Sequence, residues 1–236
     1  MISLTGQSVL VVGGSSGIGR ATATLAAALG AHVVIASRSP EKLETAASSI
    51  PGAGWRTVDV TRDDSVESLF ADGAVWDHVI VTGSEVRMDA VKTLPMATAQ
   101  AAVDSKFWGF YRVARFANIT PGGSLGVVAG FLATRPAATR ALMGAINGAL
   151  ESLVQGLALE LRPVRVNAVS PALVQTEMWD GMDAAARTAL FETMAARYPA
   201  GVIGQSEDIA RQLLLLAATP YATGTVVTLD GGASIA

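Results

Sequence analysis

The sequence predicts an α/β fold: one doubly wound domain over residues 1–236, with about seven mainly parallel strands and helices on both faces. Strand-like and helix-like patterns alternate from one end of the chain to the other. The segment Ser8–Arg38 places an apolar run, a glycine cluster, an alanine-rich helical stretch and a second apolar run in a row, which predicts one right-handed βαβ unit. Half of the residues are hydrophobic and 16% are charged, a composition that supports a well-buried core.

The other elements follow from apolar runs and helix start signals. Pro40 follows Ser39 as in a first helical turn, and Thr61 precedes two acidic residues as a capping residue does. The expected strands are Val9–Val12, Val33–Ala36, Trp55–Val60, His78–Thr82, Ser124–Ala129, Val164–Val169 and Thr225–Leu229. The expected later helices are Thr98–Ala117, Ala138–Leu161 and Glu207–Ala217. Between the last two strands, residues 172–200 predict an insertion that contains a helix.

A glycine-rich turn joins the first strand to the first helix. Glycines there let a phosphate approach the backbone, and the negative charge suits the N-terminus of the helix that follows. The position between a strand and a helix predicts a Rossmann-type dinucleotide site; the alternative is a glycine turn without a ligand. The expected contacts are Gly13, Ser15, Ser16, Gly17, Ile18 and Gly19.

The corner after the second strand indicates which dinucleotide is preferred. An acidic residue there would bind the ribose 2′-hydroxyl of NAD, whereas an arginine suits a 2′-phosphate. Ser37 and Arg38 occupy this corner, and a guanidinium can hold a phosphate through two hydrogen bonds. The sequence therefore favours NADP(H) over NAD(H). The alternative is that Arg38 is a solvated charge at the start of a helix.

Composition argues against several other functions. The net charge of −3 argues against a nucleic-acid partner, and the lack of cysteine removes thiolate chemistry. The longest aliphatic run, Leu213–Ala218, is too short to span a bilayer, and the first strand begins too early for a signal peptide. We expect a cytoplasmic protein with no membrane partner. His32 and His78 begin expected strands, so they should be structural or solvated, and we expect no metal site.

The glycine spacing, Gly-x-x-x-Gly-x-Gly, resembles that of the short-chain dehydrogenase/reductase family. Residues 165–170, Arg-Val-Asn-Ala-Val-Ser, and the following Pro171–Thr176 resemble the family's next motif. Two positions depart from the pattern: Val12 replaces a threonine and Ala172 replaces a glycine. The resemblance extends over essentially the whole chain.

The resemblance implies further cofactor contacts. It places the pair Asp59-Val60 beside the adenine ring, the Val174 backbone at the nicotinamide carboxamide and Thr176 near the phosphates. It also implies that the insertion around residues 172–200 is a substrate lid. The additional cofactor-binding residues expected on this basis are Asp59, Val60, Thr82, Gly83, Asn147, Pro171, Val174 and Thr176.

The family's catalytic positions carry unusual residues in this chain. The family uses a serine, a Tyr-x-x-x-Lys pair and an asparagine. With residues 147–150 as the register, the serine, tyrosine and lysine positions fall at Gly130, Met143 and Asn147. Methionine has no proton to exchange, so the tyrosine mechanism cannot operate.

The asparagine position is occupied by Lys106, so lysine and asparagine have exchanged helices. Lys106 shares an apolar helical face with Val103, Phe110 and Val113. In doubly wound folds the ligand lies in a crevice outside the carboxyl ends of the strands. We hypothesise that Lys106 enters this crevice as a proton donor with a lowered pKa, while Asn147 hydrogen-bonds the ribose. The alternative is that Lys106 extends to solvent or pairs with a carboxylate across a subunit interface.

Two functions compete. The first is an NADP(H)-dependent oxidoreductase with a rearranged active site, acting on a small or medium apolar carbonyl, enone or imine. The alternative is a catalytically inactive NADP(H)-binding pseudoenzyme that serves as a sensor or partner subunit. By resemblance, we also expect a homodimer or homotetramer assembled through the two long helices.

Overall fold

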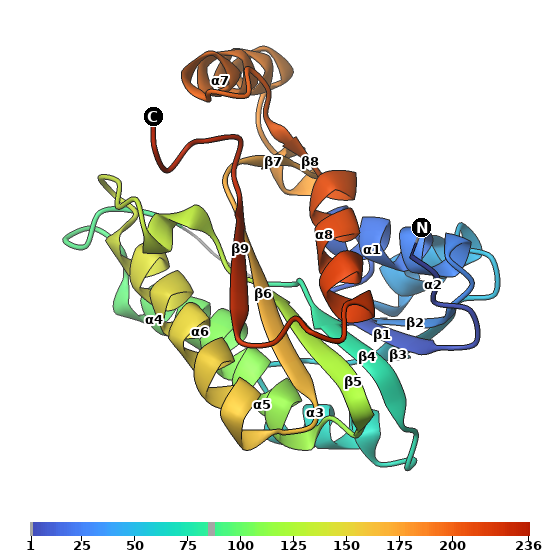
Figure 1. The fold of residues 1–236 in the computed structure, drawn as a ribbon. Helices are drawn as coiled ribbons and strands as arrows, with labels where there is room; N and C mark the ends of the chain where they lie inside the picture. Colours follow the sequence, from blue (N-terminus) through green and yellow to red (C-terminus); the bar gives the residue numbers. More distant parts are fainter. Residues whose placement is uncertain (1, 85–87) are drawn as a thin grey trace.

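A computed structural model describes residues 2–84 and 88–236 and shows a seven-stranded sheet in which all neighbouring strands are parallel (Figure 1). The strand order is β3-β2-β1-β4-β5-β6-β9. The strands are β1 (Ser8–Val12), β2 (His32–Ser37), β3 (Gly54–Thr57), β4 (Trp76–Val81), β5 (Ile119–Val128), β6 (Arg165–Pro171) and β9 (Thr225–Leu229). The doubly wound fold class is confirmed.

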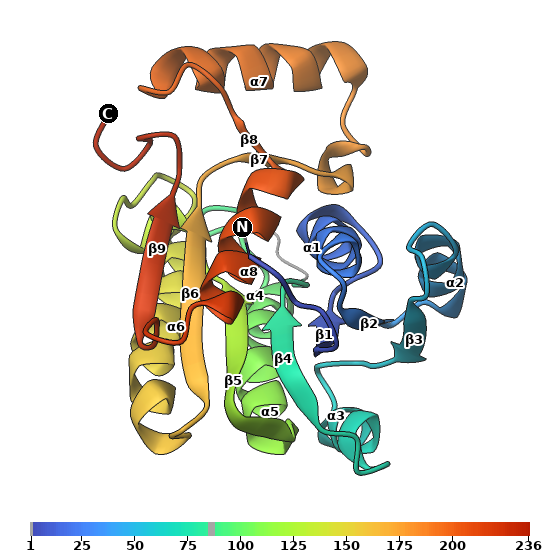
Figure 2. The ribbon, with the colours of Figure 1, turned by 45° about the vertical axis from the view of Figure 1, so that its right-hand side comes forward.

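Helices cover both faces of this sheet (Figure 2). The helices are α1 (Gly17–Ala28), α2 (Pro40–Ser48), α3 (Asp63–Phe70), α4 (Met96–Val103), α5 (Gly109–Phe116), α6 (Ala141–Glu160), α7 (Ala184–Arg197) and α8 (Ser206–Ala218). The side chains of α1, α2 and α8 form one core with the sheet, and those of α3, α5 and α6 form the other.

Strand β1 shows why two cores form. Val9 and Val11 point to the core under α1, while Leu10 and Val12 point to the opposite core, and all four are at most 2% exposed. Successive strand residues face opposite sides, so a strand that is buried on both faces is continuously apolar. The apolar run is thus explained by the two helical layers.

Some boundaries differ from the expected ones. The helix expected over Thr98–Ala117 is divided into α4, a π-helical turn over Asp104–Trp108 and α5. Strand β5 begins at Ile119, before the expected start, because Trp76 donates its N–H to the carbonyl of Asn118 and pairing starts there. Pro121, Gly122 and Gly123 lie in this first part of β5. The pairing register between β4 and β5 shifts there, between Trp76 and His78, and this shift accommodates them.

Residues 172–203 form a separate layer beyond the carboxyl end of the sheet. Strand β7 (Val174–Gln175) pairs with β8 (Gly204–Gln205), and α7 lies well apart from the sheet (Figures 1 and 2). No residue of α7 is buried. A small cluster around Tyr198 and Ile203, with Ala233 from the C-terminal segment, supports this layer.

Helix α6 has the length and apolar composition to cross a membrane, and among the described residues it is the one such helix. Composition alone does not distinguish a spanning helix from a core helix. Met143, Ile146, Leu150 and Val154 of α6 are all buried against the sheet. This packing is that of an amphipathic core helix.

His78 lies in β4, away from the carboxyl ends of the strands, and is 3% exposed. Its Nδ1 lies 2.8 Å from Ser124 Oγ and its Nε2 lies 3.1 Å from Gln7 Oε1. Burial, together with the positive charge of Arg165, lowers the pKa of His78 from 6.5 to about 4. The imidazole is therefore held neutral inside the fold.

Stability should fall on acidification because the unfolded chain takes up a proton at His78 below pH 6.5, whereas the folded chain does so only near pH 4. Because of this difference in pKa, the free energy of unfolding should be about 2–3 kcal/mol lower at pH 4.5 than at pH 7. We expect His78→Gln to remove this part of the pH dependence in urea unfolding. His32→Gln, at an exposed position, is the matched control, and an unchanged slope in the His78 variant would contradict the assignment.

Candidate active site

The glycine turn brings three backbone segments into close contact at the carboxyl end of the sheet. A Cβ at Gly13, whose φ is +86°, would overlap the backbone of Gly83, and a Cβ at Gly19 would overlap the Gly13 carbonyl. The Thr82 hydroxyl donates to the Val12 carbonyl at 3.2 Å. The turn therefore needs glycine at residues 13 and 19 for packing, apart from any ligand.

A cavity of about 250 Å³ opens beside this turn, at the ends of β1, β2 and β4. It brings together many of the residues that the sequence singles out. Predicted contacts that line it are Gly13, Ser15, Ser16, Ser37, Arg38, Asp59, Val60 and Gly83. Its wall also contains Ser105 from the π-helical turn, so the cavity reaches the segment that carries Lys106.

The corner of this cavity near α2 is rich in hydroxyl and cationic groups. Ser37 Oγ is buried there without a hydrogen-bond partner. Arg38, Ser39 and Lys42 line the same wall. Sequence reasoning missed Lys42; the signal that would have found it is its place in the first turn of α2, where Ser39 caps the Lys42 N–H at 3.3 Å.

Asp59 also lines the cavity, and its carboxylate is already hydrogen-bonded. Its Oδ1 accepts hydrogen bonds from the Thr61 N–H at 3.0 Å and from the Thr61 hydroxyl at 2.7 Å. Desolvation opposes ionisation, but these bonds and the charges of Arg38 and Arg62 together hold the pKa of Asp59 below its ordinary value. The carboxylate is therefore fixed at the rim.

Lys106 projects from the middle of the π-helical turn into the interior. Its Nζ donates to the Ala129 carbonyl at 2.9 Å and to Asn147 Oδ1 at 2.7 Å. A third contact, at 3.9 Å, is to the sulfur of Met143, a weak acceptor. The structure thus brings together Lys106, Asn147, Met143 and the residue next to Gly130. The ammonium is turned inward and bonded to uncharged groups of its own chain.

The π-helical turn that aims Lys106 is held by Arg112. The Arg112 guanidinium donates to Asp104 Oδ1 at 2.8 Å and to the Val60 carbonyl at 3.3 Å. A Cβ at Gly109 would approach Val60 Cγ2 to 2.9 Å, so the helix runs close to the cavity wall. Single π turns occur often at functional sites because they change the direction of a side chain.

Gly130 provides the space that Asn147 occupies. A Cβ at residue 130 would lie 2.6 Å from Asn147 Nδ2. Any larger residue at this position, serine included, would push against the amide that bonds Lys106. The glycine, the asparagine and the lysine are therefore one packing unit.

Burial lowers the pKa of Lys106 from 10.5 to about 8, while the negative charge of Glu151 acts in the opposite direction. Glu151 lies one turn beyond Asn147 on α6 and accepts a hydrogen bond from Ser170 Oγ at 2.9 Å. An amine with this pKa exchanges a proton readily near neutral pH.

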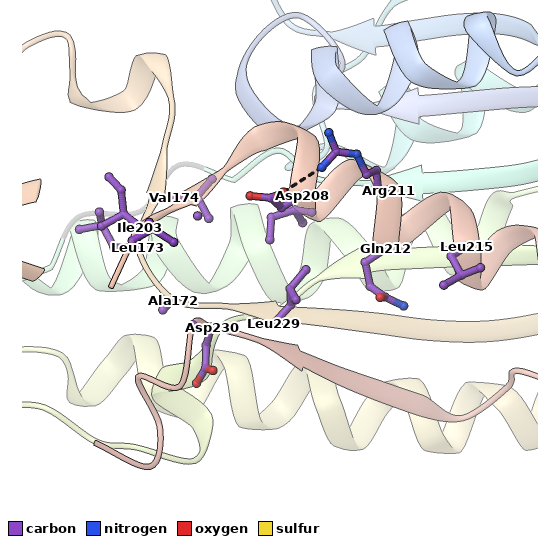
Figure 3. Close-up of a pocket in the computed structure, with 14 residues that line it drawn as sticks. Ala172, Leu173, Val174, Ile203, Asp208, Arg211, Gln212, Leu215, Leu229 and Asp230 are labelled. Atoms are coloured by element: carbon purple, nitrogen blue, oxygen red, sulfur yellow. Dashed lines mark hydrogen bonds and ion pairs between the residues drawn. The ribbon is translucent and has the colours of Figure 1, made fainter. Parts of the chain in front are cut away.

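Three other expected cofactor contacts lie outside this cavity. Gly17 and Thr176 line a second cavity of about 580 Å³ between α1, α7 and α8. Val174 lines a third, of about 350 Å³, between β9 and α8 (Figure 3). Figure 3 shows Leu173, Ile203 and Leu229 among the apolar residues that line it, together with the Asp208–Arg211 ion pair. Lys106 and Asn147 are not among its lining residues.

The remaining expected contacts line none of these three cavities. Gly19 is in the first turn of α1, Thr82 follows β4 and Asn147 is in α6. Ile18 is in the first turn of α1, and Pro171 ends β6. No group of three or more histidine, cysteine or acidic side chains in residues 2–84 and 88–236 is arranged to hold a metal ion. The polar groups near the glycine turn are the Lys106 amine, the Asn147 amide and the serine hydroxyls of the cavity wall.

Known proteins resemble this chain over nearly its whole length. Residues 12–234 match a family model described as enoyl-(acyl carrier protein) reductase. The short-chain dehydrogenase/reductase ATR9 of Stachybotrys chlorohalonatus is 34% identical, with 99% of each chain covered. Galactitol 2-dehydrogenase of Cereibacter sphaeroides is 31% identical, with 98% of this chain and 96% of that protein covered.

Solved structures agree with the sequence matches. A small-chain dehydrogenase crystallised in complex with NADPH is 32% identical and superposes with a TM-score of 0.84, covering 98% of this chain and 99% of that one. The parallel sheet, the glycine turn and these matches over nearly the full length lead to one conclusion. The chain belongs to the short-chain dehydrogenase/reductase family of oxidoreductases.

Proposed function

We propose that this protein is an NADP(H)-dependent oxidoreductase with a rearranged active site, which reduces a small or medium apolar carbonyl, enone or imine. One observation carries the proposal. The Lys106 ammonium is bonded to the Ala129 carbonyl and to Asn147 Oδ1, at the end of β5 where the family's serine and tyrosine positions converge. In this proposal Lys106 acts as the proton donor, from a different helix than the family's tyrosine.

The lining of the cavity supports the choice of a phosphorylated dinucleotide. The buried, unpartnered Ser37 hydroxyl and the cations Arg38 and Lys42 share one wall, and such groups bind a phosphate as donors. The glycine turn at the other end suits the diphosphate. The related dehydrogenase crystallised with NADPH supports the same choice. The cofactor supplies the hydride when it is bound.

Replacing Lys42 tests the 2′-phosphate site. Lys42→Met should raise the Kd for NADPH by about tenfold, as expected for the loss of one charge-assisted contact. The Kd for NADH, which lacks this phosphate, should change less than about twofold. Fluorescence titration measures both constants, and Lys92→Met, at an exposed lysine outside the cavity, is the control. An equal increase in the Kd values of NADPH and NADH would show that Lys42 does not contact the 2′-phosphate.

Lys106 is proposed to donate a proton to the substrate oxygen, and a bound cofactor would supply the hydride for the carbon bonded to that oxygen. Two of its three N–H groups are directed to oxygen acceptors, and the third faces Met143 Sδ, which binds it weakly. A carbonyl oxygen would accept this third bond more strongly than sulfur does. Asn147 fixes the orientation of the amine, and the lowered pKa makes the proton available.

Lys106→Met keeps the length and apolar stem of the side chain but removes the proton. We expect NADPH consumption against the best substrate from a panel of carbonyls and enones to fall by about 10²–10⁴-fold, while the Kd for NADPH stays within a few-fold. Lys92→Met controls for the loss of one surface lysine. Full turnover in a folded Lys106→Met protein would remove Lys106 from the mechanism.

The pH dependence follows from the lowered pKa. An acid must be protonated to act, so kcat/KM for reduction should be constant below pH 8 and fall tenfold per pH unit above the Lys106 pKa of about 8. Lys106→Arg, whose guanidinium stays charged, should show no such break up to pH 10. A wild-type profile that is flat through pH 9 would exclude a titrating amine.

The alternative is a catalytically inactive NADP(H)-binding pseudoenzyme that acts as a sensor or partner subunit. One observation favours it: Gly130 and Met143, at the family's serine and tyrosine positions, carry no hydroxyl group. Saturable binding of NADPH, with no consumption across the whole panel and no effect of Lys106→Met on binding, would decide for this alternative.

We also propose that residues 172–200 form a substrate lid and that the protein is a homodimer or homotetramer. The lid is supported by the position of α7 beyond the carboxyl end of the sheet and by its lack of buried residues. Assembly is supported by exposed apolar side chains on the π turn, α5 and α6. Trp108, at the end of the π turn, is 45% exposed, Tyr111 is 39% exposed and Leu159 is 70% exposed.

A further inference from the structure

A carboxylate from the proposed lid lies on the first turn of α1. Glu177 follows Thr176 in a short 3₁₀ turn, and its Oε2 accepts the N–H of Gly17 at 2.7 Å. Its other oxygen, Oε1, accepts a hydrogen bond from Arg20 Nη2 at 2.6 Å. Both oxygens are therefore engaged by α1, although about 160 residues separate them from it in sequence.

This carboxylate takes the role of a helix cap. Ser16 is the N-cap residue of α1, yet its side chain makes no capping hydrogen bond. The free N–H groups and the dipole at a helix N-terminus attract an anion. The Glu177 carboxylate accepts one of these N–H groups and lies at the positive end of the helix dipole, and Arg20 adds a full positive charge beside it.

A bound diphosphate would draw on the same groups. The phosphates of a dinucleotide lie at the N-terminus of the helix that follows a glycine turn. A carboxylate and a diphosphate on one helix end repel each other and compete for its N–H groups. The two partners in the Arg20–Glu177 pair are 49% and 39% exposed, so the pair can separate without opening the core.

We propose that Glu177 is an internal competitor of the cofactor diphosphate. Binding of NADPH displaces the carboxylate from Gly17, frees Arg20 for the phosphates and detaches the start of the lid from α1. Cofactor binding and lid release are then one linked event. The inference rests on the proposed cofactor site and adds to it the residue that opposes occupancy.

Glu177→Gln tests the competition because it keeps the size of the side chain and removes its charge. The Kd for NADPH, from fluorescence titration at low salt, should decrease by 3- to 10-fold. Hydrogen exchange over residues 176–183 in the cofactor-free variant should match that of NADPH-saturated wild type. Glu192→Gln, an exposed carboxylate on α7, changes the net charge equally and should leave the Kd within twofold.

A Glu177→Gln protein with an unchanged or higher Kd would overturn the inference while leaving the cofactor site intact. Glu177→Asp, which keeps the charge but shortens the reach, should give an intermediate Kd, and a value equal to that of the glutamine variant would exclude direct repulsion by the carboxylate. If neither wild type nor Glu177→Gln bound NADPH saturably, the proposed function and this inference would both be overturned.

Discussion

The arrangement of the site depends on the hydrogen bond between the Lys106 ammonium and Asn147 Oδ1. Burying an ammonium costs free energy unless its N–H groups are hydrogen-bonded. The 2.7 Å bond to the Asn147 amide and the 2.9 Å bond to the Ala129 carbonyl offset most of this cost. The amide fits only because residue 130 is glycine. The unusual residues at these three positions therefore depend on one another, and reverting one alone would leave the others badly placed.

Much of the fold could be predicted from sequence because the governing patterns are local. The apolar runs of β1, β2 and β6 and the glycine turn have clear periodicity and breakers, and their strands lie within a few residues of the predicted bounds. The apolar neighbours of Lys106 left two alternatives open, an inward amine or one that extends to solvent, and the contacts to Ala129 and Asn147 show the inward one. The π-helical turn could not be predicted in this way, because it adds a residue to a helix without changing composition.

The missed features of the site come from contacts between distant segments. Lys42 belongs to the cavity wall because α2 starts at the corner of β2, and Glu177 meets Gly17 across about 160 residues of sequence. No periodicity in the chain encodes either contact. Only the helix start at Ser39 points to Lys42 in the sequence, whereas Glu177 is indistinguishable from a solvated surface residue until the fold brings Gly17 close.

The π-helical turn makes the length of the helix as important as its composition. It changes the rotational phase between α4 and α5, so Ser105 faces the cofactor cavity while Lys106 reaches Asn147. Loss of a single residue within Asp104–Trp108 would restore the regular α-helical phase and rotate the amine by about 100°. Such a deletion would therefore move the ammonium away from Asn147 and the Ala129 carbonyl without any change in the sheet.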